Sequence, residues 1–227
     1  MTSQPADGRT PLSDEILARN QDVWDRMLGH RFVRDIEEDR LDPAVFHRYL
    51  AYENAFVETA ILIFGYAMVK APGLAEQRWL IGVLKALSEE QITYFRDTFD
   101  RLGMAEAEWR DLPLPPPVTA FRDGMLAIAA HGPYADGIAA MFAAEWMYWT
   151  WCSRAAKRTI SDPVLRRWVD LHAEEGFASQ ARWLRSQIDI LGAEMGARSR
   201  DRLVGVFRHA MELEIAFHEA AYGTPEA

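Results

Sequence analysis

Residues 137–153 (GIAAMFAAEWMYWTWCS) form a helix-length stretch in which Glu145 is the only charged residue. A helix that is apolar on most faces must be buried, so other helices have to surround it. Burying an ionised carboxylate without a partner is costly, so Glu145 either finds hydrogen-bond partners or takes up a proton. The stretch predicts a central helix that carries a carboxyl group inside the protein. For this one glutamate, a structural hydrogen-bond network is an equally good interpretation.

Two further stretches repeat this pattern of one acid on an apolar stripe. Steps of three and four residues from Phe46 reach Glu53, and the same steps from Leu203 reach Glu214. Three glutamates at close range cannot all ionise without cations or a protonated member. We therefore expect Glu53, Glu145 and Glu214 to line one pocket.

Helix start and stop signals predict an all-α fold, a bundle of about seven to eight helices. Asp42 and Pro43 provide an N-cap and a first-turn proline. The remaining signals predict one domain over residues 13–223, preceded by a disordered tail at residues 1–12. The expected helices cover residues 13–30, 43–71, 74–102, 105–111, 118–130, 134–159, 163–191 and 199–222.

The composition limits the class of partner. The chain has 227 residues and a formal net charge of -9, and its Lys and Arg residues are scattered. Phosphate backbones require clustered basic side chains, so we expect no nucleic-acid partner. The apolar stretches are interrupted by Glu and fall short of a bilayer span, so we expect no membrane partner. A polar first dozen residues and a single cysteine indicate the cytoplasm.

Metal and thiol chemistry are the first two candidate uses of these acids. Helical bundles bind iron with Glu-x-x-His pairs, and this chain has none, since Glu214 and His218 are four residues apart. We therefore expect no metal and no other cofactor. Cys152 is the only thiol. A small buried hydrophobe is the better interpretation of it than a nucleophile, because nothing near it in sequence would lower its pKa.

A pocket for a small heteroaromatic amine is the third candidate. Aromatic rings stack on a flat ring, a protonated Glu donates to a ring nitrogen, and an ionised Glu accepts from an amino group. The sequence offers further polar and aromatic candidates for the pocket: Tyr52, Phe56, Asp123, Tyr148, His172 and Phe217.

Over residues 30–222 the chain resembles the TenA family, also called thiaminase II or aminopyrimidine aminohydrolase. The resemblance rests on RFVRDIEEDRLDPAVFHRYLAYENAF, AAEWMYW, RRWVDLHAEEGF and ELEIAFHEAAYG. It implies a heme-oxygenase-like helical bundle. It also implies that Glu53 binds the pyrimidine, that Glu214 is the catalytic glutamate, and that Tyr148 and Phe217 line the pocket.

The chain departs from the thiaminase pattern at several pocket positions. Thiaminases carry a nucleophilic cysteine where this chain has Ala144, directly before Glu145. Phe56, Asp123 and His172 stand where those members usually have tyrosines. The resemblance is therefore to the cysteine-less branch, which is associated with the salvage of amino- or formylamino-methylpyrimidines derived from thiamin.

These observations predict a hydrolase that releases ammonia or formate from such a pyrimidine, with Glu145 or Asp123 as the base for an attacking water. Two alternatives are a non-catalytic pyrimidine-binding or regulatory protein and a metal-dependent oxygenase on the same fold. Since the family typically forms tetramers, we expect a homotetramer or homodimer.

Overall fold

The computed structural model describes residues 10–223, and the regular elements of that range are all helical. Residues 1–9, which include most of the expected tail, lie outside the described residues. The α-helices are α1 (Leu12–Arg19), α2 (Gln21–Leu28), α3 (Arg31–Glu37), α4 (Pro43–Lys70), α5 (Leu74–Ala86), α6 (Ile92–Leu102), α7 (Glu106–Arg110), α8 (Pro116–His131), α9 (Tyr134–Ala155), α10 (Pro163–Ala173), α11 (Glu175–Ala193) and α12 (Ala197–Ala220).

The all-α prediction is confirmed, but the predicted number of helices is wrong. Because η1 (Leu87–Gln91) joins α5 to α6, the described range contains eleven separate helical rods. Asn20 interrupts the first expected helix, and its side chain donates to the carbonyl of Ile16 at 3.0 Å and to that of Val204 at 3.1 Å. Glu174 interrupts the expected helix over residues 163–191 with an extended backbone. The short helix α3, which is not among the expected helices, accounts for the rest of the difference, and α7 corresponds to the helix expected over residues 105–111.

Local capping chemistry sets several of the helix starts. The side chain of Asp42 accepts from the backbone N–H of Ala44 at 2.8 Å, as the sequence predicts. Asp162 caps α10 in the same way. Ser13, where the sequence predicts the first helix to begin, lies within α1 and donates through its N–H and its hydroxyl to Asp189 of α11.

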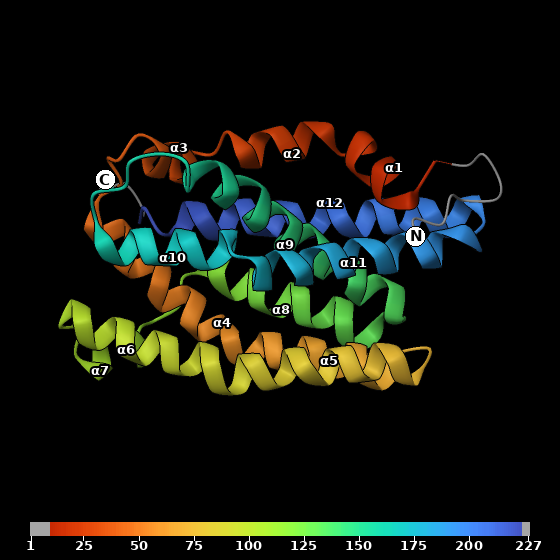
Figure 1. Cartoon of the computed structure of the whole chain (residues 1–227), viewed down its shortest axis with the longest axis horizontal. Coiled ribbons are helices and arrows are strands. Elements are labelled where there is room, and N and C mark those ends of the chain that lie inside the picture. Colours follow the sequence, from red (N-terminus) through yellow and green to blue (C-terminus); the bar gives the residue numbers. More distant parts are fainter. Residues whose placement is uncertain (1–9, 224–227) are drawn as a thin grey trace.

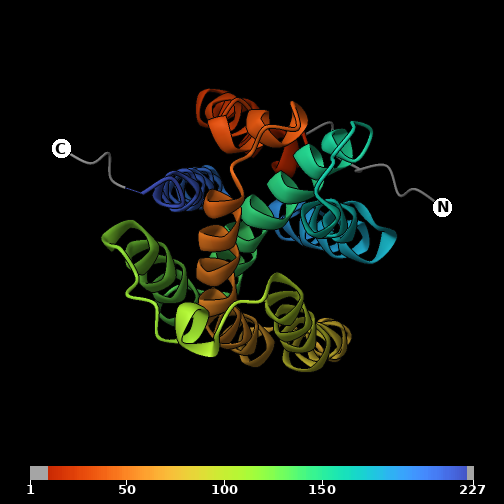
Figure 2. The ribbon, with the colours of Figure 1, turned by 90° about the vertical axis from the view of Figure 1, so that its left-hand side faces the viewer.

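Helix α9 runs through the interior, as its apolar sequence requires. Sixteen of its residues are buried. It packs most extensively against α11 and α12, which flank it in Figure 2, and it also contacts α4, α8 and α10. Helices α1 to α3 cover one side of this central layer, and α5 to α7 lie on the opposite side (Figure 1). Within residues 10–223, no helix has the length and apolar character needed to cross a membrane.

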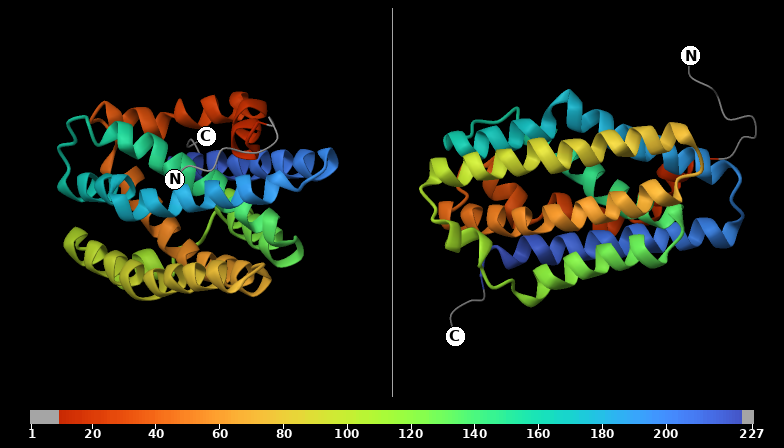
Figure 3. Two further views of the ribbon diagram at one scale, coloured as in Figure 1. Left: turned by 45° about the vertical axis from the view of Figure 1, so that its right-hand side comes forward. Right: turned by 90° about the horizontal axis from the view of Figure 1, so that it is seen from below.

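The outer layer formed by α4, α5 and α6 encloses the interior on the lower side of the molecule (Figure 3). Lys70, at the end of α4, ties this layer to α8. Its ammonium group donates to three carbonyl oxygens near the C-terminal end of α8, where the helix dipole favours a cation. These are the carbonyls of Ala129 at 2.6 Å, Ala130 at 2.8 Å and Gly132 at 2.7 Å.

Between α5 and α6 the helix winds as a π-turn, η1. A π-turn places one more residue in a turn than an α-helix does, and such turns are frequent at functional sites. Leu87, Glu90 and Gln91 of η1 line the cavity described below.

Candidate active site

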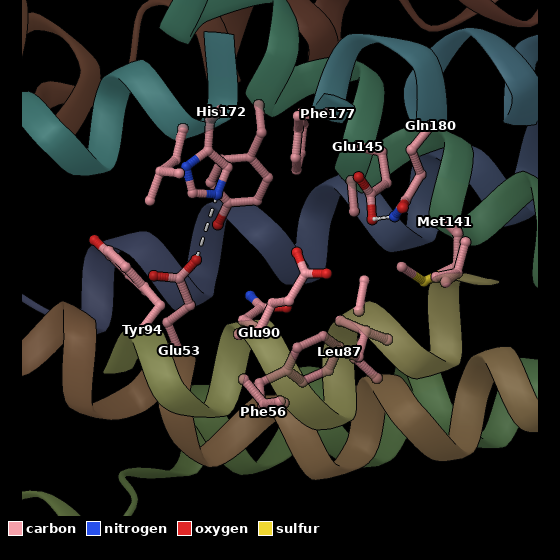
Figure 4. A pocket seen from close by; sticks show the side chains of 18 of the residues that line it. Glu53, Phe56, Leu87, Glu90, Tyr94, Met141, Glu145, His172, Phe177 and Gln180 are labelled. Atoms are coloured by element: carbon pink, nitrogen blue, oxygen red, sulfur yellow. Dashed lines mark hydrogen bonds and ion pairs between the residues drawn. The ribbon is translucent and has the colours of Figure 1, made fainter. Parts of the chain in front are cut away.

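A cavity of about 460 Å³ lies inside the bundle, enclosed by residues of α4, α5, η1, α6 and α8 to α12. Among residues 10–223, the wall is mainly aromatic and aliphatic, with five glutamates and one histidine and without a Lys or Arg. Glu53, Glu145 and Glu214 all belong to this wall, as do Tyr148 and His172. Figure 4 shows the side chains that converge on it. A wall without cations suits a neutral or cationic ligand and disfavours an anionic one.

Glu53 of α4 meets α10 at one end of the cavity. One carboxyl oxygen, Oε2, accepts from the indole N–H of Trp168 at 2.8 Å. The other, Oε1, lies 3.7 Å from Nε2 of His172 (Figure 4). Burial raises the pKa of Glu53 to about 8, and the hydrogen bond from Trp168 opposes that rise. Glu53 is therefore largely protonated at neutral pH.

His172 is held in one tautomer by its own helix. Its Nδ1 lies 2.9 Å from the carbonyl oxygen of Trp168, one turn earlier, so Nδ1 carries the proton and donates it. Nε2 is then an acceptor directed toward Glu53. Burial lowers the pKa of His172 to about 4, so the ring is neutral at pH 7. This end of the cavity therefore presents one acceptor, Nε2 of His172, beside the carboxyl group of Glu53, which becomes a second acceptor when it ionises.

Glu214 of α12 is 1% exposed. The hydroxyl of Tyr148 donates to its Oε2 over 3.5 Å, and the hydroxyl of Tyr49 lies 2.7 Å from that of Tyr148. Since Tyr148 has one proton to donate, Tyr49 is the donor between the two tyrosines. Burial, followed by the charges of Glu53 and Glu145, raises the pKa of Glu214 well above its usual value. Glu214 is thus a neutral acid with a proton to give.

Glu145 reaches the cavity from α9. Its Oε1 accepts from Nε2 of Gln180 on α11 at 2.8 Å (Figure 4), and its Oε2 is buried without a hydrogen-bond partner among residues 10–223. Burial raises the pKa of Glu145 to about 7. Tyr148, three residues later on the same helix, does not pair with Glu145, because its hydroxyl pairs with Tyr49 and Glu214.

Phe56 and Phe217 line the cavity, as expected, together with a residue that the sequence did not indicate, Phe121 of α8. The ring centroid of Phe121 lies 4.5 Å from that of Phe56 and 4.8 Å from that of Phe217. The three rings form an apolar wall of the kind that stacks on a flat ligand.

Two predicted pocket residues lie elsewhere. Asp123 follows Phe121 by two residues, about 200° around α8. Its side chain is 61% exposed and pairs with Arg122 at 2.8 Å, so placing it in the pocket was wrong. Tyr52 does not line the cavity either, because it precedes Glu53 by one residue, about 100° around α4. It packs behind the wall, with its ring centroid 6.4 Å from that of Phe217.

The position of the thiol agrees with the sequence interpretation. Ala144, which stands where thiaminases carry their cysteine, lines the cavity beside Glu145. Cys152 is fully buried and is not part of the cavity wall. Burial raises the pKa of the Cys152 thiol well above its usual value, which keeps it protonated.

Two residues that hydrogen-bond to the acids, Gln180 and Trp168, were not predicted from the sequence. Trp168 had a weak signal, since it lies four residues before His172 on one helix face. Gln180 had none, because its position relative to Glu145 depends on the helix break at Glu174. In the described part of the chain, no group of three or more His, Cys, Asp and Glu side chains is arranged to hold a metal ion.

Fold and site together define a class: an all-helical bundle whose acidic, aromatic cavity suits a small molecule. The sequence profile of the TENA/THI-4/PQQC family matches residues 17–224, so the chain belongs to that family. A curated relative, the aminopyrimidine aminohydrolase of Halalkalibacterium halodurans, is 22% identical over 204 residues, covering 89% of this chain and 91% of the relative.

Solved structures agree on the fold. A TenA homologue from Pyrococcus furiosus is 19% identical and superposes with a TM-score of 0.85, covering 93% of this chain and 100% of that structure. A protein with a heme oxygenase-like fold from Shewanella denitrificans is 10% identical, with a TM-score of 0.73 and coverage of 92% and 91%. The TenA resemblance is confirmed, and the bundle has the expected heme-oxygenase-like architecture.

Proposed function

We propose that this protein hydrolyses an aminopyrimidine derived from thiamin by carboxylate acid–base chemistry, without a cysteine nucleophile. The observation that carries the proposal is the convergence of Glu53, Glu145 and Glu214, from three helices, on one aromatic cavity. The similarity to a relative named aminopyrimidine aminohydrolase supports the choice of substrate. Ala144 beside the acids, with Cys152 outside the cavity, supports water rather than a thiolate as the nucleophile.

Glu145 is the proposed general base. A base works best when its pKa is close to the operating pH, and burial raises the pKa of Glu145 to about 7. In the proposed step, Glu145 takes a proton from water while the water oxygen bonds to the substrate carbon. The C–N bond of the leaving group breaks with its electron pair going to nitrogen, and Glu145 returns the proton taken from water to that nitrogen, which leaves as ammonia.

Glu214 and the Glu53 end of the cavity bind the ring in this proposal. Glu214, kept neutral by burial, donates to a ring nitrogen and draws electron density from the reacting carbon. His172 Nε2 accepts from the exocyclic amine, and Glu53 Oε1, 3.7 Å from Nε2, accepts from the same amine when the carboxyl group is ionised. The phenyl rings of Phe56, Phe121 and Phe217 hold the ring plane.

The test is to incubate the purified full chain with aminomethyl- and formylaminomethyl-pyrimidine and to measure ammonia, formate and the hydroxymethyl or aminomethyl product. Glu145→Gln is expected to lower kcat by at least about 100-fold, since general-base catalysis contributes roughly 10²–10⁴. Glu212→Gln is the matched control, because Glu212 is an exposed residue of the same helix as Glu214.

Calorimetry on the same samples separates the alternatives. Tight binding of both pyrimidines without product would replace the hydrolase with a non-catalytic pyrimidine-binding protein. The absence of both binding and turnover would refute the proposed function.

A further inference from the structure

Gln180 is a half-buried residue of α11 with no part in the steps above. Its amide Nε2 is 2.8 Å from Glu145 Oε1, and within residues 10–223 it is the only hydrogen-bond partner of that carboxyl group. The contact joins two helices that pack along each other, α9 and α11. A side-chain amide that donates to a carboxylate stabilises the ionised form and holds one oxygen in place.

The other charged groups near the cavity do not provide this support. Those that face it are acids or a neutral ring: Glu53 from α4, Glu90 from η1, His172 from α10, Glu174 between α10 and α11, and Glu214 from α12.

The two arginines of α11, which both follow Gln180 in the sequence, are engaged elsewhere. Arg182 lies over the ring of Trp149 and pairs with Glu175, and Arg185 lies over the ring of Trp146 and pairs with Asp14. In the part of the chain that the structure describes, the wall has no guanidinium or ammonium group, and the amide of Gln180 is the one donor that favours an ionised Glu145.

We propose that Gln180 is a positioning residue for Glu145, whose amide orients the carboxyl group and keeps enough of it ionised at neutral pH to accept a proton. That this proton comes from the water that attacks the substrate rests on the function proposed above. The coupling between Gln180 and Glu145 is a property of the folded chain and can be measured without substrate.

The direct test is a titration of Glu145 in the full chain by ¹³C NMR with carboxyl-labelled glutamate, where the resonance absent from Glu145→Gln identifies the group. Gln180→Met removes the donor at similar volume and is expected to raise the pKa of Glu145 by about one, the effect of losing one hydrogen bond to a charged group. Gln180→Lys supplies a cation and is expected to lower that pKa. Gln91→Met removes another glutamine of the cavity wall and is expected to leave it unchanged.

Opposite shifts in the two Gln180 variants support the proposal, because a purely structural role would not produce them. A midpoint that is the same in wild type, Gln180→Met and Gln180→Lys would overturn it. Circular dichroism checks that each variant is folded. If one of the two Gln180 variants does not fold, the other still tests the proposal.

The pH dependence of turnover adds the catalytic part. The rate falls at low pH as the base is protonated, so this acidic limb is expected to move to higher pH in Gln180→Met and to lower pH in Gln180→Lys. If the pKa of Glu145 shifts in the NMR titration but the acidic limb of the pH–rate profile stays in place, the positioning role is overturned. If no pyrimidine is turned over by any form, the proposed function fails, and the titration still decides whether Gln180 controls Glu145.

Discussion

Replacing Glu145 with glutamine is expected to make the fold less sensitive to alkaline pH. The folded-state pKa of Glu145 is about 7, against 4.5 for an ordinary glutamate. Below pH 4.5 the group is protonated in both the folded and the unfolded chain, so it contributes no difference. As the pH rises, the unfolded chain loses this proton first, and the free energy of unfolding falls until the folded form also ionises.

The size of this loss follows from the two pKa values. At about 1.4 kcal/mol per pH unit, the wild type loses about 3 kcal/mol through this one group. Glutamine cannot ionise, and its side-chain oxygen can still accept from Gln180. Its amide nitrogen adds a cost that does not depend on pH. As the pH rises, the free energy of unfolding of Glu145→Gln is therefore expected to increase by about 3 kcal/mol relative to that of the wild type.

Urea unfolding followed by tryptophan fluorescence, between about pH 4.5 and about pH 8.5, measures this difference. Glu212→Gln on the surface of α12 is the control. Its free energy of unfolding is expected to differ from that of the wild type by an amount that does not change with pH. The reasoning is refuted if the difference between Glu145→Gln and wild type is also flat, or if the variant loses stability relative to wild type as the pH rises.

Three further substitutions test other features. Cys152→Ala is expected to keep kcat/KM, measured by product release, while lowering the free energy of unfolding by about 1 kcal/mol, because the buried thiol packs but does not react. Asp123→Asn is expected to leave kcat/KM unchanged, and a ten-fold loss would show that this exposed, Arg122-paired carboxylate reaches the substrate. Lys70→Met is expected to cost about 1–3 kcal/mol in urea unfolding, since buried carbonyls at the end of α8 lose a charged donor; no change in stability would mean that water replaces the ammonium group.

The buried faces of the long helices could be predicted from sequence. A period of 3.6 residues assigns each position of a helix to a face, and this is why Glu53, Glu145 and Glu214 were expected inside, where they lie. The helix limits at Asp42 and Gly103 were also readable, because an N-cap carboxylate and a left-handed glycine have local causes.

Features that depend on contacts between distant segments could not be read in this way. Asn20 breaks a helix by donating to the carbonyl of Val204, and Glu174 breaks another although no Pro or Gly stands at the break, since Gly176 lies within α11. The second break determines how α11 lies on α9, and so it determines that Gln180 reaches Glu145. Asp123 was misplaced because the resemblance pointed two residues beyond Phe121, and an error of two residues turns a helical side chain to the opposite side.

The π-turn in residues 87–91 joins α5 to α6. The orientation of α6 depends more on the number of residues in this helix than on the identity of its surface residues. If the same residues were wound as a regular α-helix, the extra residue that the π-turn absorbs would rotate α6 by about 100° relative to α5. Tyr94 would leave the cavity wall, and the buried ring of Phe99 would turn toward water. Over evolutionary time, this helix can accept many exchanges on its solvent side, whereas an insertion or deletion that the π-turn does not absorb would be selected against.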